Sequence, residues 1–340
     1  MAAGFEKKQT DKTRPRILRT AAITAAFIAG ILLISSAGIK IYDLVRRTEE
    51  RKIASGFGIY DPADAGGHSL NVVTYGNENG HTIVFLSGLG IEDMCITYRD
   101  MTDILAEENR IVFIDRAGYG LSDDSLTPMT VKQIVDEYRK ALDNSGIKGP
   151  VILAAHSLGG VYATYWESVY PGDVEAVVLL DSTQLEEETF PKGKPENKHS
   201  LPEILLNKTG LFRLSIAGVS ADLPANADLQ DEEAAQAMSY LMSTSSLWNF
   251  AMDSEYDLIR DNCKTTWDSI VTNDIPKIYI CASWASETEQ KYIDARNNIL
   301  IPYLQKMGNC ELKLLPGSHL IYEQRPEECA DLIKELIKKI

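Results

Sequence analysis

The sequence predicts an α/β fold in which helices cover both faces of a mostly parallel sheet. Short apolar runs typical of buried strands alternate along the chain with amphipathic segments typical of helices, and this order favours parallel strands joined by helical crossovers. The chain has 340 residues, 44% hydrophobic and 24% charged, which is ordinary for one large globular domain with additional segments. The predicted strands are residues 70–75, 82–86, 110–115, 151–155, 176–181, 277–281 and 311–315.

The N-terminal segment predicts a membrane helix. Residues 20–39 contain no charged side chain, and a run of this length is just sufficient to span a bilayer. The preceding tail, residues 1–19, has a denser cluster of basic residues than the segment that follows the apolar run, which predicts a cytoplasmic N-terminus and an extracytoplasmic body. Secretion after signal cleavage is the alternative, because Ser35-Ser36-Ala37 resembles a small-residue cleavage site.

The rest of the chain divides into a linker, a core and an insertion. Residues 40–65 are predicted to link the membrane helix to the body, with a flexible, glycine-containing junction at the end of this segment. Residues 66–181 and 276–340 carry the alternating strands and helices of the core. Residues 182–275 show no clear strand, and successive helix-like pieces there predict a helical cap inserted into the core.

Two helices of the core have clear start signals. After Pro128, Thr130 and Gln133 have the spacing of a capping box, and apolar residues recur on one face of the segment that follows. The last helix opens at Pro326 with two glutamates in its first turn, where the positive end of the helix dipole favours acidic side chains. Both patterns indicate amphipathic helices that pack on the sheet.

A serine lies at the bend between a predicted buried strand and a predicted helix. Ser157 follows the strand at 151–155, and the small residues Ala155 and Gly159 allow strand and helix to approach closely. The helix that starts at Leu158 directs unpaired backbone N–H groups toward the space above the serine, where an oxyanion could form. This arrangement is typical of an enzyme nucleophile, although an N-terminal helix cap is the other role that a serine takes at such a position.

A histidine near the C-terminus is the candidate base. His319 follows the last predicted strand, and parallel strands place such residues at the carboxyl edge of the sheet together with Ser157. Histidine can accept the proton of a serine hydroxyl near neutral pH. His156 is next to the serine, but its side chain is expected to turn into the fold.

Four motifs resemble those of the α/β-hydrolase superfamily, over the chain from about residue 66 to the end. The resemblance implies the α/β-hydrolase fold and an oxyanion hole formed by the backbone N–H groups of Leu158 and Leu89, with Gly88 at the substrate. The motifs are Ser87-Gly88-Leu89-Gly90, Asp115-Arg116-Ala117-Gly118-Tyr119-Gly120-Leu121-Ser122, Ala155-His156-Ser157-Leu158-Gly159-Gly160 and Gly317-Ser318-His319.

The third member of the catalytic triad has two candidates. In most members of this superfamily an acid follows the strand after the cap, but here Glu287 comes slightly late. Some members carry the acid at the end of the strand that follows the nucleophile helix, and Asp181 occupies that place. We favour Asp181, whose carboxylate would fix the histidine tautomer. The alternative role for this residue is to anchor the cap.

The net charge of the chain argues against nucleic-acid binding. It is −15, and because the tail at 1–19 is basic the remainder is more acidic still, whereas a nucleic-acid-binding protein needs a basic face. The five cysteines lack the spacing of a zinc site, and nothing in the sequence predicts a metal or an organic cofactor.

These observations predict a carboxylesterase- or lipase-like serine hydrolase that cleaves an ester or related acyl bond of a small, apolar substrate through an acyl-enzyme. Met238, Met242 and Trp248 of the cap are the candidate lining of the substrate pocket, with packing inside the cap as their alternative role. The alternative function is a non-catalytic member of the fold that binds a ligand or a partner.

Overall fold

The computed structural model describes residues 13–91, 94–185, 249–283 and 290–340, together with positions 202, 206, 209–211, 213 and 241. The eight described strands form one sheet in the order β1-β2-β4-β3-β5-β6-β7-β8. β1 pairs antiparallel with β2 and β2 antiparallel with β4, and every other pair is parallel. The strands are β1 Pro62–Asp64, β2 Ser69–Gly76, β3 Thr82–Leu86, β4 Arg110–Ile114, β5 Val151–His156, β6 Val174–Leu180, β7 Lys277–Ser283 and β8 Cys310–Pro316.

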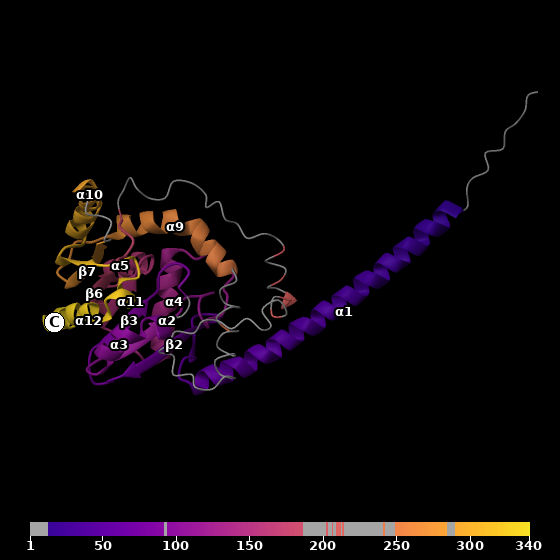
Figure 1. Ribbon diagram of the computed structural model, residues 1–340, viewed down its shortest axis with the longest axis horizontal. Coiled ribbons are helices and arrows are strands. Elements are labelled where there is room, and N and C mark those ends of the chain that lie inside the picture. Colours follow the sequence, from indigo (N-terminus) through magenta and orange to yellow (C-terminus); the bar gives the residue numbers. More distant parts are fainter. Residues whose placement is uncertain are drawn as a thin grey trace, which may run out of the picture.

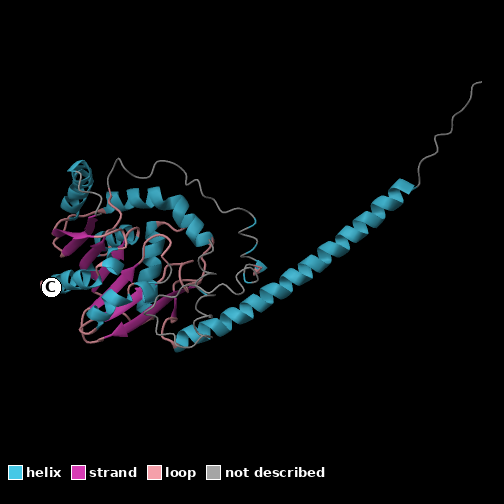
Figure 2. Cartoon of the chain, in the orientation of Figure 1, coloured by secondary structure: helices cyan, strands magenta, loops and turns pink. Residues whose placement is uncertain are grey.

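Helices cover both faces of this sheet (Figures 1 and 2), as the sequence predicts. Two separate apolar cores, one on each face, hold them in place. The helices on the first face are α4 Val131–Asn144, α5 Gly159–Val169, α9 Phe250–Ser269 and α10 Gln290–Met307. Those on the second face are α2 Met94–Thr97, α3 Arg99–Ala106, α11 Ile321–Gln324 and α12 Pro326–Ile337, and the short 3₁₀ helix Pro171–Asp173 precedes β6.

The central strand β5 shows why the predicted strands form. Successive side chains of a strand point to opposite faces, so Leu153 and Ala155 enter the first core while Ile152 and Ala154 enter the second. All six residues of β5 are buried. A strand that is buried on both faces requires an uninterrupted apolar run, which is the pattern seen in the sequence.

The start of α4 differs in one detail from the predicted capping box. Thr130 caps the helix, and its Oγ1 accepts a hydrogen bond of 3.2 Å from the backbone N–H of Gln133. The Gln133 side chain does not return to Thr130, because its Nε2 donates to Oε1 of Glu137 at 2.8 Å instead. Glu137 is buried one turn further along the helix and needs a donor, so only half of the capping box forms.

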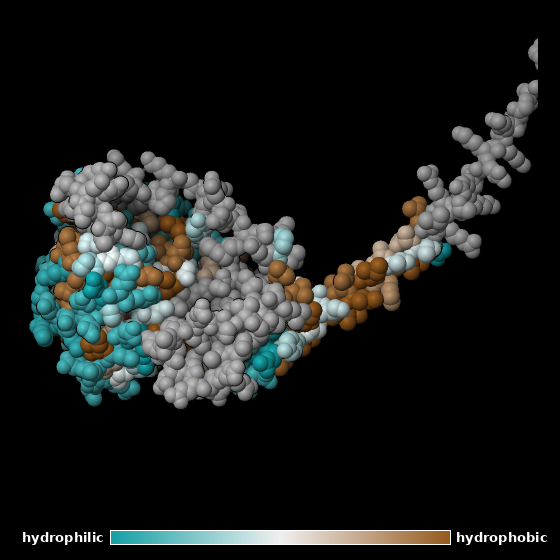
Figure 3. All heavy atoms as spheres, in the orientation of Figure 1, coloured by the Kyte–Doolittle hydropathy of each residue, from teal (hydrophilic) through white to brown (hydrophobic). Residues whose placement is uncertain are grey.

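The N-terminal helix α1 runs without interruption from Thr13 to Gly56 and projects from the body (Figure 1). It is long and apolar enough to cross a membrane, and no residue of its apolar stretch is buried. Apolar side chains cover much of the projecting part, as the brown surface in Figure 3 shows.

Most of the segment predicted as a linker, residues 40–65, is regular structure. Residues 40–56 continue α1, and Pro62–Asp64 forms the edge strand β1, so the body begins before residue 66. The chain between helix and strand is held by the buried side chain of Asn71, which accepts from the backbone N–H of Asp61 at 2.9 Å and donates to the carbonyl of Ile59 at 3.1 Å. These long-range hydrogen bonds fix a segment whose local composition indicates flexibility.

Candidate active site

Ser157 lies on a strained turn between β5 and α5, as the sequence predicts. Its φ is 51°, a left-handed conformation that is uncommon for a residue with a side chain. The helix passes close to β3 at Gly159, where an added Cβ would lie 2.5 Å from the carbonyl oxygen of Leu86. The serine backbone is held in this conformation because its carbonyl accepts hydrogen bonds from Gly160 at 3.0 Å and from Thr183 at 2.9 Å.

The structure brings Ser157, His319 and Asp181 together. Nε2 of His319 lies 2.9 Å from Oγ of Ser157, and Nδ1 of the same ring lies 2.7 Å from Oδ2 of Asp181. The second carboxylate oxygen of Asp181 accepts from the backbone N–H of Ala282 in β7 at 3.0 Å. The carboxyl ends of β5, β6 and β8 therefore supply one continuous chain of hydrogen bonds from carboxylate to hydroxyl.

The hydrogen-bonded chain is accessible from outside the protein. The side chain of His319 is 44% exposed, whereas that of Asp181 is 15% exposed. A partly buried carboxylate beside an accessible imidazole is suited to orient the ring while the ring exchanges protons with a ligand. The alternative acid Glu287 and the predicted pocket residues Met238, Met242 and Trp248 lie outside the described residues.

The loop after β3 lies directly over the serine. An added Cβ on Gly88 would be 2.8 Å from Cβ of Ser157, so only glycine fits at this position. Leu158 is the N-cap residue of α5, and neither its backbone N–H nor that of Leu89 donates to another residue in the described part of the chain. Both groups are therefore available to an oxygen atom bound beside Ser157.

Arg116 is a further residue of the site, and its side chain is buried. It holds the loop in position. Its Nη1 donates to the carbonyl of Ser87 at 2.9 Å and to the hydroxyl of the same residue at 2.8 Å, and its Nη2 donates to the carbonyl of Gly88 at 2.8 Å. The guanidinium fork thus binds two consecutive residues of the loop. Its placement inside a predicted Gly-rich turn was the only sequence signal that could have indicated this role.

Glu255 of α9 balances the charge of Arg116. Its Oε1 lies 2.7 Å from Nε of the arginine, and its two carboxylate oxygens accept from the hydroxyls of Tyr119 and Tyr162. Burial, and next the charge of Glu255, raise the pKa of both tyrosines well above the usual value, so they remain protonated donors. Burial alone would lower the pKa of Arg116, but Glu255 outweighs it, and this pKa also lies well above the usual value.

His156 supports the loop that carries His319. The side chain points into the fold as expected, and its Nε2–H donates to the carbonyl oxygen of His319 at 2.9 Å. The two rings lie 4.5 Å apart between centroids. Burial, and next the nearby His319, lower the pKa of His156 to about 4, so this ring is neutral near pH 7. Its Nδ1 finds no hydrogen-bond partner among the described residues.

Comparisons with known proteins agree with the fold. Residues 83–332 match the model of the alpha/beta hydrolase family. The chain is 25% identical over 331 residues to the uncharacterized protein YbdG of Bacillus subtilis, which covers 97% of this chain and 99% of that protein. The solved epoxide hydrolase VrEH1 from Vigna radiata is similar with a TM-score of 0.57 and 21% identity, over 83% of this chain and 98% of that one.

The enol-lactonase from Burkholderia xenovorans LB400 is similar with a TM-score of 0.54 and 16% identity, over 82% of this chain and 100% of that one. Both solved structures are similar in fold. The family model covers more than half of the chain, and it includes Ser157, Asp181 and His319. This protein therefore belongs to the alpha/beta hydrolase family.

Proposed function

We propose that this protein is a serine hydrolase that cleaves a carboxylic ester, or a related acyl bond, of a small apolar substrate. The observation that carries the proposal is the continuous set of contacts from Asp181 through His319 to Ser157, with distances of 2.7 Å and 2.9 Å. A hydroxyl on a strained turn, in contact with an oriented imidazole, is the arrangement that nucleophilic acyl transfer requires.

In the proposed acylation step, Oγ of Ser157 forms a bond to the carbonyl carbon while its proton moves to Nε2 of His319. The electron pair of the carbonyl moves to its oxygen, which the backbone N–H groups of Leu158 and Leu89 stabilise. When this oxyanion collapses, the bond to the alcohol breaks and His319 returns the proton to the alcohol oxygen. Asp181 stabilises the transient imidazolium throughout.

Deacylation repeats the same steps with water as the nucleophile. His319 removes a proton from water, whose oxygen attacks the acyl carbon. When the resulting oxyanion collapses, the bond between the acyl carbon and Oγ of Ser157 breaks and His319 returns the proton to Oγ. Arg116 contributes indirectly, since it fixes the loop that presents the N–H group of Leu89. Each turnover therefore produces one alcohol and one carboxylic acid and restores the free serine.

The residue at the turn distinguishes between reactions of this family. Members that hydrolyse epoxides or remove halogen use an aspartate at this position, and a serine favours acyl transfer instead. One solved neighbour is named an enol-lactonase, and a lactone is a cyclic ester. This name supports the ester class by analogy, because fold alone does not determine the substrate.

We further infer that α1 anchors the hydrolase in a membrane, with the N-terminus in the cytoplasm and the body on the other side. The apolar stretch of α1 and the basic residues ahead of it support this orientation. Cleavage after Ala37 would instead release the body. The intact mass of the protein from its native host distinguishes the two, because cleavage removes the first 37 residues.

Labelling with a fluorophosphonate probe tests the hydrolase proposal. The full chain is expected to react, and Ser157→Ala is expected to abolish labelling. Ser182→Ala is the matched control, because this nearby hydroxyl donates to the carbonyl of Ala155 at 2.7 Å and is expected not to react. The proposal fails if the folded wild type is not labelled, or if Ser157→Ala retains the label. A series of p-nitrophenyl esters of increasing acyl length then defines the substrate range.

A further inference from the structure

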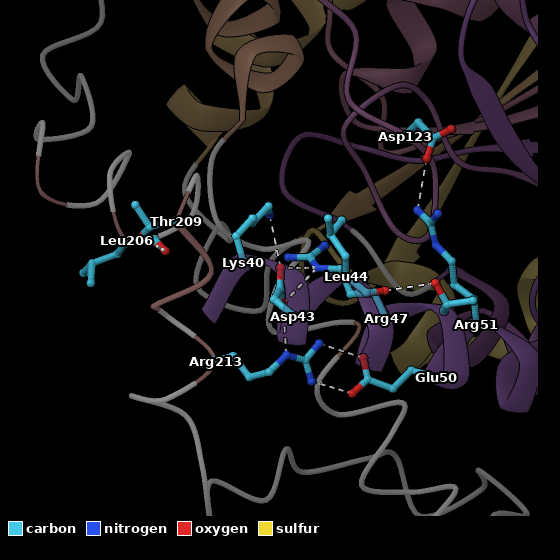
Figure 4. A network of polar contacts seen from close by, with 11 residues as sticks. Lys40, Asp43, Leu44, Arg47, Glu50, Arg51, Asp123, Leu206, Thr209 and Arg213 are labelled. Atoms are coloured by element: carbon cyan, nitrogen blue, oxygen red, sulfur yellow. Dashed lines mark hydrogen bonds and ion pairs between the residues drawn. The ribbon is translucent and has the colours of Figure 1, made fainter. Parts of the chain in front are cut away.

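The last turns of α1 have one face against the body. Asp43, Glu50 and Ala54 are buried, and their spacing of seven and four residues places them on the same side of the helix. Asp43 and Glu50 both bind Arg213, which belongs to the insertion between β6 and β7 (Figure 4). Nε of Arg213 lies 2.9 Å from Asp43, and its two terminal nitrogens hold the Glu50 carboxylate at 2.5 Å and 2.9 Å. A bidentate pair of this kind fixes the orientation of both partners.

The same turns also contact the core. Nη2 of Arg51 lies 3.0 Å from Oδ1 of Asp123, and the buried Ala54 packs with Leu121 of the core and Leu241 of the insertion. Leu121 lies in the glycine-containing turn that carries Arg116, the residue that holds the loop over Ser157. This face of α1 therefore contacts both the core and the insertion, and residues 57–61 join the helix to β1.

The opposite face of these turns is apolar and exposed. Four apolar side chains on this face are each more than half exposed: Ile41, Tyr42, Leu44 and Val45. They lie beyond the charge-free stretch at residues 20–39. The charge of Lys40 is directed to the other face, where its Nζ lies 3.2 Å from Asp43. Away from the body, the apolar surface of α1 thus continues about 9 Å beyond Ile39, at a rise of about 1.5 Å per residue.

Lipid is the occupant that fits this exposed face. The face is continuous with the membrane-spanning stretch, it carries no exposed charge before Arg46, and it includes a tyrosine at the position where aromatic side chains favour the membrane interface. Val45 lies beyond Asp43 along the helix, so a bilayer that covers Val45 reaches the level at which Arg213 binds. Arg213 then lies at the level of the lipid headgroups.

We propose that the end of α1 that Arg213 binds forms a surface that lies on a lipid bilayer, and that this attachment gives the active site access to esters dissolved in the bilayer. The substrate part of this inference rests on the proposed hydrolase function and on the anchor. A rigid mounting raises the effective concentration of the site at the membrane surface, whereas a flexible tether would allow the body to rotate away.

Lipid contact is tested first, independently of activity. A fluorophore on Val45→Cys of the full chain in phosphatidylcholine vesicles is expected to be quenched when part of the lipid carries a nitroxide group below the headgroup. The matched control is Val271→Cys, another exposed valine on the body, which is expected to remain unquenched. Equal responses at the two positions would overturn the proposal. So would self-quenching at position 45 that disappears on dilution in lipid, because a second copy would then cover this face.

A flexible segment added to α1 tests whether the rigid attachment gives the active site access to esters in the bilayer. Six residues of alternating Gly and Ser are inserted between Ile39 and Lys40, and the control protein carries the same six residues ahead of Met1. With p-nitrophenyl butyrate in water, both proteins are expected to match the wild type. With p-nitrophenyl palmitate embedded in vesicles, the internal insertion is expected to reduce turnover at least about fivefold relative to the control, since a flexible tether lowers the effective concentration.

Equal turnover of the embedded ester by both proteins would overturn the proposal that the rigid attachment to α1 gives the active site access to esters in the bilayer. Absence of butyrate hydrolysis by the wild type would instead contradict the hydrolase function and with it the substrate part of the inference. The quenching result would still decide whether the surface meets lipid.

Discussion

The two ends of the sheet each hold an acid and a base in contact, but the two pairs differ in their access to solvent. At the carboxyl end, Asp181 and His319 are 2.7 Å apart and the imidazole is 44% exposed. At the amino end, Lys277 at the start of β7 and Glu167 of α5 are 3.8 Å apart, and neither side chain is exposed. A pair of this second kind cannot reach a substrate.

Further polar contacts inside the fold hold the pair at the amino end in place. Nζ of Lys277 donates to Oδ1 of Asn273 at 2.7 Å and to the carbonyl of Ile275 at 2.9 Å, and the amide of Asn273 donates to Glu167 at 2.7 Å. Burial lowers the pKa of Lys277 and raises that of Glu167, so each depends on the other to remain charged. These contacts indicate a structural role.

Two residues of the candidate active site also have a strained backbone, whereas Lys277 and Glu167 are not among the described residues with positive φ. Ser157 and Asp181, both at the carboxyl end, adopt left-handed conformations with φ values of 51° and 41°. Such conformations cost about 1–3 kcal/mol each and persist where the surroundings enforce them, commonly at functional sites. Access to solvent and enforced strain together distinguish the candidate active site from the buried ion pair, and four predictions test this difference.

The largest expected effect is that of Asp181→Asn. An asparagine keeps the shape but favours the wrong tautomer of His319, and we expect kcat for p-nitrophenyl butyrate to fall about 10⁴-fold. Asp173→Asn is the control at the amino end, where this residue pairs with Arg139 at 2.6 Å. It is expected to leave kcat unchanged. If Asp181→Asn has only a small effect on kcat, another carboxylate must orient His319.

Lys277→Met is expected to act on stability and not on chemistry. It leaves Glu167 buried without its cation, which costs about 3–5 kcal/mol of unfolding free energy. Denaturant unfolding measures this loss, and kcat of the folded fraction is expected to remain as in the wild type. The double variant Lys277→Met/Glu167→Leu should recover most of the stability. A loss of kcat at unchanged stability would contradict the structural role.

The third prediction concerns pH and His156. Its pKa is about 4 in the folded protein and near the usual 6.5 in the unfolded chain, so only the unfolded chain binds the proton between these values. Stability is therefore lost as the pH falls from about 6.5 to about 4, by about 3 kcal/mol. His156→Gln keeps a donor to His319 but cannot titrate. The difference in unfolding free energy between the wild type and this variant should therefore fall as the pH is lowered from about 6.5 to about 4. A difference that does not change with pH would refute the lowered pKa of His156.

The smallest expected effect is that of Arg116→Lys. Lysine keeps the charge but loses the fork that binds Ser87 and Gly88, and we expect kcat to fall about 10²-fold with KM nearly unchanged. Arg139→Lys is the matched control. The guanidinium carbon of Arg116 lies 3.7 Å from the ring centre of Tyr119, and that of Arg139 lies 3.6 Å from the ring centre of Tyr170 at the other end of the sheet. Arg139→Lys should leave kcat unchanged. If both variants reduce kcat equally, the effect of Arg116→Lys does not depend on its contacts with the loop over Ser157.

Local patterns in the sequence determined the strands, the turn at Ser157 and the position of His319. These features depend on neighbouring residues: an apolar run that is buried on both faces, small residues around a tight turn, and a loop after a strand. β1 escaped prediction because three residues are too few to show a period, and its pairing with β2 determines that it is a strand.

Only the tertiary structure decided which groups meet across the fold. Three sets of contacts join residues that are distant in sequence: Asp181 with His319, Arg116 with the loop over Ser157, and Arg213 with the end of α1. No local spacing encodes such contacts, because they arise where the carboxyl ends of neighbouring strands converge or where a helix packs against the body. The sequence by itself therefore determined the elements and the candidate nucleophile and base, and packing decided which carboxylate contacts His319 and how the end of α1 contacts the body.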